Sequence, residues 1–503
     1  MEYELLAAVD LGSNSFRLQV GRVVGDQIYP LDGLREPVRI AAGLTPQKML
    51  DGASQLRATE ALRRFNERLR GFEPGAVRAV GTNTFRVAKN AAYFLLQAEA
   101  ALGFPIEVIG GREEARLIYL GVAHTLPRPA EQQLVVDIGG GSTEFIIGAN
   151  FVPQALESLY VGCVGYSLQF FRNGQVDKRS FADAVFAARR EIQTISQPYR
   201  ELGWDEAIGT SGSFKAILDL VEAGGWGLHG VVTREALERL RAQLIRAGHA
   251  ERLGFGDLRA DRVAVLPGGL SILIAVFEEL GLSQMSFSEG ALRLGVLYDL
   301  LGRYHHHDLR DATVAEFQRR YQVDRRQAER VATTGRHLLT GLLQDGQHEM
   351  QFLSWAGLLH EIGISVAHTG YHKHSAYILA NADMPGFSRM DQGRLARVVL
   401  AHRGKLERVQ AIDRESRDWL LILALRVAAI LHRARQDIPL PSVSLARGAR
   451  AGFVIEADHD WLAANPLTAA SLSAEIQQWA QIGFELSLRA QRKKKVLAID
   501  RDG

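Results

Sequence analysis

Two segments of the chain share an arrangement of residues that suits phosphate binding. Each segment combines an aspartate at the end of a strand, a glycine turn and a charged residue, at identical spacing. The segments are Asp10-Leu-Gly-Ser-Asn-Ser-Phe-Arg17 and Asp137-Ile-Gly-Gly-Gly-Ser-Thr-Glu144. Such a turn directs backbone N–H groups toward one point, where phosphate oxygens bind. A single strand, glycine turn and strand is usually an ordinary hairpin. Two such segments with matched spacing predict a phosphate site that both share. Its predicted phosphate-binding residues are Gly12, Ser13, Asn14, Gly139, Gly140, Gly141 and Ser142.

Three acidic residues beside these turns predict a metal site. Asp10 and Asp137 end the strands that lead into the turns, and Glu144 lies two residues after Ser142, on the same face of the returning strand. Mg²⁺ usually takes one or two carboxylates together with waters and phosphate oxygens. We therefore expect Mg²⁺ or Mn²⁺ as the cofactor, near all three acids. Taken singly, each acid could equally cap a turn or remain exposed.

Basic and hydroxyl side chains elsewhere are further candidates to bind phosphate. Phosphoryl transfer requires charge neutralisation, and the guanidinium group matches paired phosphate oxygens. Arg17, Arg86 in GTNTFR and Arg293 in SEGALRLG could supply this charge, or each could form a surface ion pair. The segment GTSGSFKA adds the candidates Ser211, Gly212, Ser213 and Lys215. A strand-to-helix turn capped by Ser213 explains the same segment equally well.

The elements that must position these residues alternate between strand and helix over residues 1–302. LLAAVD reads as a buried strand, ASQLRATEALRRFNERLRG as a helix, and the pattern restarts at LVVDIGGGSTEFIIG. This alternation predicts the α/β class, with one hairpin in each of two similar domains, residues 1–123 and 124–302. Helices then predominate over residues 303–503, with a short sheet near SVSLARG and GFVIEA. We place a linker at residues 302–311, where His305 to His307 are polar linker residues or metal ligands.

Six motifs, in this order, resemble those of the exopolyphosphatase and guanosine pentaphosphate phosphatase (Ppx/GppA) family. They are AAVDLGSNSFRL, GTNTFRVAKN, GREEARLIYLGV, VVDIGGGSTEFIIG, GTSGSFKAI and SEGALRLGVLY, and HSAYILANADMPGF extends the likeness toward the C-terminus. The resemblance is closest to the full-length bacterial exopolyphosphatases. It implies two actin-like (ribonuclease H-like) ATPase-superfold domains around a cleft, Mg²⁺ dependence, removal of terminal phosphates by water, and a homodimer.

The resemblance also assigns the general base. The family motif carries a catalytic glutamate at the position of Glu114, so we expect Glu114 to accept the proton of the attacking water. Acidic residues are common in the first turn of a helix because the helix dipole favours them, and we interpret Glu113 in this way.

The C-terminal part resembles a helical metal phosphohydrolase fold named for its His-Asp pair. It contains His337, His360, Glu361, His368, His372, His374 and His402. The pair is His-Glu here, and Ala429 stands where the later aspartate is expected. Because a hard metal site without its last carboxylate is doubtful, we expect this HD-like domain to be non-catalytic and to bind polyanions or form a dimer.

Charge is divided unevenly along the chain. Residues 303–503 carry 28 Lys and Arg against 22 Asp and Glu, whereas residues 1–302 carry 31 against 35. The basic part could guide a polyanion or could be a solvated Arg-rich surface. We favour exopolyphosphatase activity, a phosphoric anhydride hydrolysis. The alternatives are a guanosine-5'-triphosphate,3'-diphosphate (pppGpp) phosphatase and an actin-class ATP-dependent kinase or ATPase.

The remaining composition predicts where the chain works. Its single cysteine, Cys163, excludes internal disulfides and fits a reducing cytoplasm, and we interpret it as a packed core residue. No apolar run reaches the roughly 18 residues of a membrane span, and the N-terminus lacks signal-peptide features. We expect a cytoplasmic protein without a membrane span and without a nucleic-acid partner, while peripheral membrane association stays open.

Overall fold

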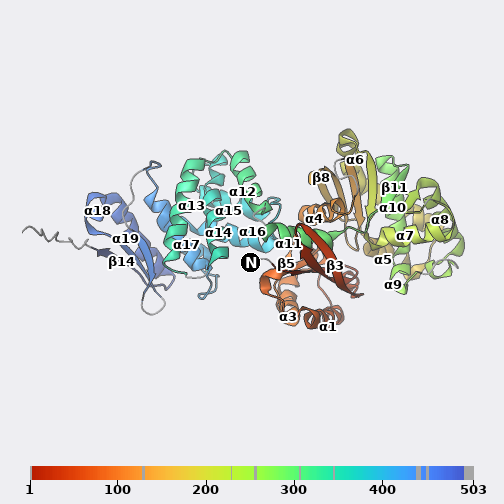
Figure 1. Cartoon of the computed structure of the whole chain (residues 1–503), viewed down its shortest axis with the longest axis horizontal. Helices are drawn as coiled ribbons and strands as arrows, with labels where there is room; N and C mark the ends of the chain where they lie inside the picture. Colours follow the sequence, from red (N-terminus) through yellow and green to blue (C-terminus); the bar gives the residue numbers. More distant parts are fainter. Residues whose placement is uncertain are drawn as a thin grey trace, which may run out of the picture. The chain divides into compact units, whose positions relative to one another are not determined.

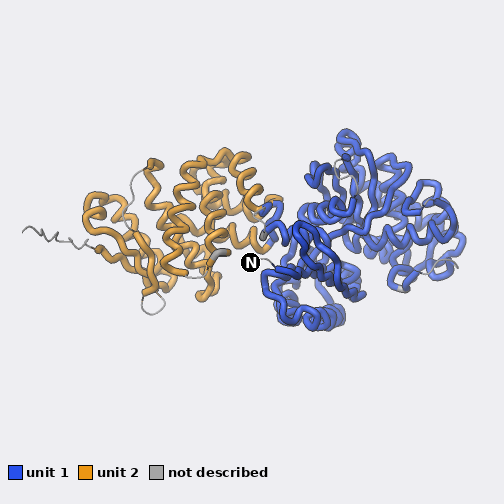
Figure 2. Tube along the Cα trace, in the orientation of Figure 1, with its two compact units in different colours: residues 1–309, 385–389 blue, residues 310–384, 390–503 orange. Residues whose placement is uncertain are grey.

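The computed structural model describes residues 3–126, 131–227, 229–253, 258–304, 308–343, 346–437, 443–448 and 452–491. Unit 1 comprises residues 1–309 and 385–389, and unit 2 comprises residues 310–384 and 390–503 (Figure 2). The predicted linker histidines at 305–307 and the basic run at 492–495 lie outside the described residues. Within the described ranges, no helix combines the length and the apolar character needed to cross a membrane.

The first sheet of unit 1 is built around a central strand that is apolar on both faces. Its strand order is β3-β2-β1-β4-β5. The strands are β1 (Leu5–Leu11), β2 (Phe16–Val24), β3 (Gln27–Glu36), β4 (Val77–Gly81) and β5 (Ile106–Val108). Ala7, Val9 and Leu11 of β1 pack toward helices α1 (Gly52–Leu69) and α3 (Ala91–Leu102). The alternate residues Leu6 and Ala8 pack toward α4 (Gly111–Ala123) and α11 (Leu292–Tyr304), as the two-residue period of a strand requires.

The second sheet has the order β10-β11-β9-β6-β7-β8. Figure 1 labels β8 and β11 of this sheet. Its strands are β6 (Gln133–Ile138), β7 (Thr143–Ala149), β8 (Val152–Leu159), β9 (Glu206–Thr210), β10 (Val231–Thr233) and β11 (Gln284–Phe287). One face packs against helices α5 (Cys163–Phe170), α6 (Lys178–Leu202), α7 (Ser211–Ala223), α8 (Arg234–Ala247) and α10 (Leu266–Leu280). Val135 and Ile146 on the other face share a core with α4 and α11, so these two helices lie between the sheets. The predicted boundary at residue 123 remains a prediction.

The two predicted hairpins occur at equivalent positions of the two sheets. In the first, Asp10 of β1 is the cross-strand partner of Arg17 of β2. In the second, Asp137 of β6 is the cross-strand partner of Glu144 of β7. The predicted equivalence of Arg17 and Glu144 is therefore confirmed at the level of strand register.

Unit 2 is mainly helical and ends in a small sheet. Its helices are α12 (Leu309–Arg320), α13 (Arg325–Thr340), α14 (Gln347–Leu359), α15 (Tyr371–Asn381), α16 (Arg389–Ala401), α17 (Asp418–Leu431), α18 (His459–Ala464) and α19 (Pro466–Gln481). The sheet has the order β12-β13-β14, with strands Ser444–Arg447, Phe453–Asp458 and Leu486–Gln491. The predicted short sheet is confirmed, while α18, α19 and β14 were not predicted.

Candidate active site

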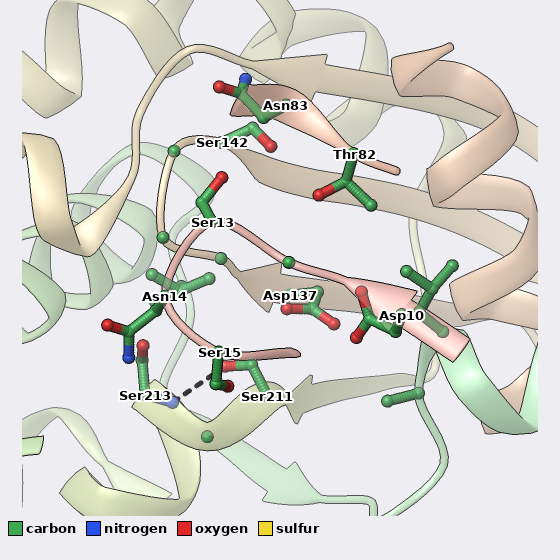
Figure 3. A pocket seen from close by; sticks show the side chains of 18 of the residues that line it. Asp10, Ser13, Asn14, Ser15, Thr82, Asn83, Asp137, Ser142, Ser211 and Ser213 are labelled. Atoms are coloured by element: carbon green, nitrogen blue, oxygen red, sulfur yellow. Dashed lines mark hydrogen bonds between the residues drawn. The ribbon is translucent and has the colours of Figure 1, made fainter. Parts of the chain in front are cut away.

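A cavity of about 120 Å³ in unit 1 brings the predicted residues together from both sheets (Figure 3). Most of its lining comes from the two hairpin turns, the start of α7, and the start of α11. The predicted residues that line it are Asp10, Gly12, Ser13, Asn14, Arg17, Glu114, Asp137, Gly139, Gly140, Gly141, Ser142, Glu144, Ser211, Gly212, Ser213 and Arg293. Arg86 and Lys215 do not line it.

The two hairpin turns approach each other so closely that glycine is required. A Cβ atom on Gly140 would lie 3.0 Å from Ser13 Cβ and 3.1 Å from the backbone nitrogen of Asn14. A Cβ atom on Gly141 would lie 2.6 Å from Asn83 Oδ1. These distances are shorter than ordinary contacts, so a larger residue at Gly140 would press against the first turn, and one at Gly141 would displace the amide of Asn83. The spacing between the two predicted phosphate-binding turns is thus set by their glycines.

The three predicted metal-binding carboxylates line this cavity, Asp137 and Glu144 buried and Asp10 half-buried, and Figure 3 shows Asp10 and Asp137 among its lining side chains. Burial raises the pKa of Asp10 to about 6, although Arg293 and Arg17 oppose this change. Burial, together with repulsion from Glu114 and Asp10, raises the pKa of Asp137 to about 7. Burial and the charges of Glu114 and Asp137 also raise the pKa of Glu144 well above its usual value. The site therefore concentrates negative charge that is costly without a cation.

These carboxylates suit a hard divalent cation. Asp10 Oδ1 is buried and has no hydrogen-bond partner among the described residues, so it is available as a ligand. Within the described ranges, no three His, Cys, Asp or Glu side chains converge as a ready-made metal site. Mg²⁺ needs only one or two carboxylates when phosphate oxygens and waters complete its coordination. The assignment of Asp10, Asp137 and Glu144 as ligands remains a prediction.

Glu114 lies in the first turn of α4 and is held by Arg86. Arg86 Nη1 donates a hydrogen bond to Glu114 Oε2 over 2.7 Å and another to the carbonyl of Ile109 over 3.0 Å. Burial favours the neutral guanidine, but the Glu114 charge outweighs it and raises the pKa of Arg86. Arg86 therefore contacts the predicted base instead of lining the cavity, and its role as a phosphate ligand remains a prediction.

Ser158 of β8 fixes a second acid of the cavity. Ser158 Oγ donates a hydrogen bond to Glu144 Oε1 over 2.8 Å. This bond restricts the carboxylate of Glu144 to one orientation. Sequence reasoning missed Ser158 because its contact with Glu144 arises from the pairing of β7 with β8.

Glu113, the neighbour of Glu114, belongs to a separate buried network. It accepts hydrogen bonds from Arg116 over 2.8 and 2.7 Å, and from the backbone N–H of Gly386 over 2.9 Å. Arg116 also pairs with Asp299 over 2.5 Å. The interpretation of Glu113 as a residue outside the reaction is consistent with these contacts.

Two half-buried cations, Arg17 and Arg293, lie close to the acids. Burial and the neighbouring Arg293 lower the pKa of Arg17 to about 9, although Asp10 opposes the change. Burial also lowers the pKa of Arg293, while Asp10 and Asp137 oppose this. Buried guanidinium groups that repel each other are stabilised by an anion between them. Arg17 and Arg293 therefore make the cavity suitable for a phosphate group.

The GTSGS segment contributes its serines but directs its lysine elsewhere. Ser211, which has φ of 88°, accepts hydrogen bonds from the backbone nitrogens of Ser213 and Phe214 over 3.2 and 3.3 Å. Ser211, rather than Ser213, thus satisfies the first N–H groups of α7. Lys215 pairs with Asp219 over 2.8 Å, and 45% of its side chain is exposed. Its predicted phosphate contact remains a prediction.

Several residues of the cavity were not predicted as site residues. They are Ser15, Thr82, Asn83, Ile118, Ile138, Cys163, Arg262, Ala291 and Leu292. Cys163 is buried, as the core interpretation predicted, and its thiol accepts a hydrogen bond from Ser213 Oγ over 3.4 Å. The side-chain nitrogen of Asn83 is buried without a partner among the described residues and is available to a ligand. Thr82 and Asn83 belong to the same GTNTFR motif as Arg86, and this motif could have identified them as site residues.

Three of the C-terminal histidines, His360, His372 and His402, form a cluster in unit 2. The ring centroids of His360 and His402 lie 5.2 Å apart, and those of His372 and His402 lie 6.3 Å apart. Ring nitrogens of His360 and His402 bond to the carbonyls of Gly357 and Val399 over 2.7 and 2.5 Å, and burial lowers the pKa of both rings. These contacts are typical of neutral structural histidines, and the non-catalytic role of this domain remains a prediction.

Comparison with known proteins gives matches along nearly the whole chain. The model of the Ppx/GppA phosphatase family matches residues 19–304, and that of Ppx/GppA phosphatase domain III matches residues 309–476. A guanosine-5'-triphosphate,3'-diphosphate pyrophosphatase of Vibrio parahaemolyticus is 39% identical over 497 residues, which cover 97% of this chain and 98% of the relative. The protein of the same name from Vibrio vulnificus is 38% identical over 495 residues, covering 97% and 98%.

Solved structures match the α/β part. The structure of an exopolyphosphatase from Cytophaga hutchinsonii has a TM-score of 0.54 and 23% identity, and the match covers 59% of this chain and 98% of that one. At this identity the likeness concerns the fold alone. The predicted fold class is confirmed: two α/β sheets that resemble actin-like ATPase domains are followed by the helical domain III.

Proposed function

Because this chain belongs to the Ppx/GppA phosphatase family, we propose that it hydrolyses the terminal 5′-phosphate of pppGpp. The observation that carries the substrate assignment is the identity of 39% to a guanosine-5'-triphosphate,3'-diphosphate pyrophosphatase over 97% of the chain. This proposal replaces our preference for polyphosphate, which rested on the extended basic C-terminal part.

The residues of the cavity have complementary parts in the proposed reaction. Backbone N–H groups of the two hairpin turns bind oxygens of the terminal phosphate, and Arg17 and Arg293 neutralise its charge. Glu114, oriented by Arg86, accepts a proton from the attacking water. The water oxygen forms a bond to the terminal phosphorus as the bridging P–O bond breaks, and the remaining nucleotide leaves with its new terminal phosphate.

A divalent cation fits this scheme. Held by Asp10, Asp137 and Glu144, it would neutralise phosphate charge and relieve the repulsion among the buried carboxylates. A homodimer remains an expectation that accompanies the family assignment.

Inorganic polyphosphate is the second candidate substrate. The observation in its favour is the excess of basic over acidic residues in 303–503, 28 against 22, which suits a long polyanion. The third candidate is an ATP-dependent kinase or ATPase with the same actin-like fold. Unlike the two phosphatase candidates, it would require ATP.

Phosphate release from pppGpp, polyphosphate of defined length and ATP, measured side by side with Mg²⁺, tests the proposal. We expect the highest kcat/KM with pppGpp. A higher kcat/KM with polyphosphate would make the second candidate the function, and preference for ATP would support the third.

A further inference from the structure

A second cavity of unit 1 adjoins the active cavity at Asn14. It has a volume of about 780 Å³, against about 120 Å³ for the active cavity, and Asn14 lines both. Both polar atoms of the Asn14 side chain are buried without a hydrogen-bond partner among the described residues. An amide with unsatisfied donors and acceptors at this junction is available to a ligand that extends from one cavity into the other.

The size and lining of the larger cavity suit an organic ligand. Cavities of about 300–1,000 Å³ with a partly apolar lining are typical of small-molecule sites. Leu168 of α5, Phe171 and Val265 supply apolar surface, while Arg39 and Arg172 supply charge. A bare phosphate chain has no group that would gain from the apolar part.

Arg39 and Arg172 are unpaired cations of this cavity. Both are exposed, and within the described part of the chain neither guanidinium has an ion-pair or hydrogen-bond partner. Arg39 has φ of 51°, and its backbone nitrogen donates to the carbonyl of Asn14 over 2.8 Å. A non-glycine residue in this left-handed conformation is strained, and such residues cluster at functional positions.

The segment that carries Arg172 is also held in place. His249 bonds through Nε2 to the carbonyl of Asn173 over 2.7 Å, and the buried Phe171 precedes Arg172 in the chain. Arg39 is fixed to the phosphate-binding turn through Asn14. Both guanidinium groups that line the cavity are therefore attached to backbone held by hydrogen bonds.

We propose that this cavity binds the nucleoside of a purine nucleoside 3′,5′-polyphosphate, with Arg39 and Arg172 pairing with its 3′-diphosphate. The inference rests on the proposed function, since it places the 5′-terminal phosphate in the active cavity. Asn14 then contacts the 5′-phosphates where they pass between the cavities. The subsite confers preference for pppGpp over GTP, which lacks the 3′-diphosphate, and over tripolyphosphate, which lacks the nucleoside.

A third cavity provides the contrast. It has a volume of about 460 Å³ and meets the active cavity at Arg17 and Arg293 instead of at Asn14. Arg35 also lines it. A phosphate chain that leaves the active cavity by this route does not meet Arg39 or Arg172, so substitutions at these positions should separate the substrates.

The test uses full-length protein and three substrates: pppGpp, GTP and tripolyphosphate. We expect the double variant R39E/R172E to raise KM for pppGpp at least tenfold, with kcat unchanged and KM for GTP and tripolyphosphate within twofold of wild type. Ala42→Trp, at an exposed position lining the cavity, should raise KM for both nucleotides but not for tripolyphosphate. R179E/R190E, at two exposed arginines of α6, has the same charge change and should alter none of the three values.

Each other result overturns part of the scheme. Unchanged KM for pppGpp in R39E/R172E and Ala42→Trp, in protein that turns over pppGpp, would remove the subsite and leave the proposed function intact. An equal rise in KM for all three substrates would show that the arginines bind phosphate whether or not a nucleoside is present. This result would also overturn the proposed nucleoside subsite. Absence of pppGpp hydrolysis by wild type, with tripolyphosphate cleaved, would instead overturn the proposed function.

Discussion

The carboxylate of Glu114 accepts a hydrogen bond from Arg86, with 2.7 Å between Oε2 and Nη1. Arg86 is simultaneously held by the carbonyl of Ile109, so the acid is anchored to backbone that precedes its own helix. The proposed base would therefore present its carboxylate to the attacking water in an orientation set by Arg86. The pair therefore distinguishes Glu114 from Glu113, whose partners are Arg116 and Gly386.

Glu114→Gln should lower kcat by about 10²–10⁴-fold, because general base catalysis typically contributes that much. The amide preserves the shape of the side chain, so KM should change little. The measurement is phosphate release under saturating substrate, with Glu113→Gln as the matched control. If Glu114→Gln loses less than roughly tenfold while Glu113→Gln loses far more, Glu114 is the wrong glutamate.

Asp137→Asn should depress turnover strongly while the protein stays folded, since the substitution removes a charge next to the phosphate-binding turn. Excess chelator should abolish wild-type activity, and Mg²⁺ should restore it. The control is Asp183→Asn, at an exposed position of α6. Undiminished activity of Asp137→Asn, or of wild type in chelator, would rule out the metal assignment.

Ser158→Ala should raise the Mg²⁺ concentration needed for half-maximal activity by about 10–100-fold, the usual effect of removing a hydrogen bond to a metal ligand. The reason is the lost bond to Glu144. With saturating Mg²⁺, kcat should approach that of wild type. Ser473→Ala, whose hydroxyl bonds to the carbonyl of Ala469, serves as the control. An unchanged Mg²⁺ requirement would mean that Ser158 does not position a ligand.

Asp299→Asn should destabilise unit 1 at neutral pH by about 3–5 kcal/mol, because it removes the charge of the buried carboxylate that pairs with both Arg116 and Arg78. Burial opposes ionisation, but Arg116 and Arg78 outweigh it and hold the pKa of Asp299 below its usual value. The stability that ionised Asp299 contributes is fully present above its pKa in the unfolded chain, about 4. It is lost as pH falls through the lower pKa of Asp299 in the folded protein.

Urea unfolding of wild type and Asp299→Asn, measured from pH 7 to pH 3, checks this dependence. The difference in stability between the two proteins should stay constant down to about pH 4 and then shrink as pH falls further. A constant difference in stability across the range would contradict the prediction.

KM for long polyphosphate should rise more steeply with salt than KM for pppGpp, because a longer polyanion releases more counterions on binding to basic residues. The measurement is KM for both substrates over a series of salt concentrations. Equal slopes would show that the basic balance of residues 303–503 is only a solvated surface.

The parts of the site that sequence predicted best are those encoded locally. Asp10 and Arg17, or Asp137 and Glu144, belong to single hairpins, so glycine turns and strand periodicity suffice to bring them together. The pairing of Arg86 with Glu114 joins α2 (Asn83–Val87) to α4 and depends on the packing of separate elements.

Lys215 illustrates a different limit. Its motif fits a phosphate loop, but α7 already begins at Ser211, which places Lys215 one turn along the helix and four residues before Asp219. A local ion pair then holds the lysine on the exposed side. The residue at which a glycine-serine segment becomes helical determines where each following side chain points. The composition of the segment does not reveal which residue that is.

The matched hairpins carry opposite charges at corresponding places, Arg17 in one and Glu144 in the other. Two identical hairpins would present the same electrostatic environment to both sides of a phosphoryl group, and the group could bind equally well in either orientation. Because Arg17 in one hairpin corresponds to Glu144 in the other, the two hairpins are not electrostatically equivalent. In the proposed site, a phosphoryl group bound between the turns would therefore meet a different charge on each of its two sides.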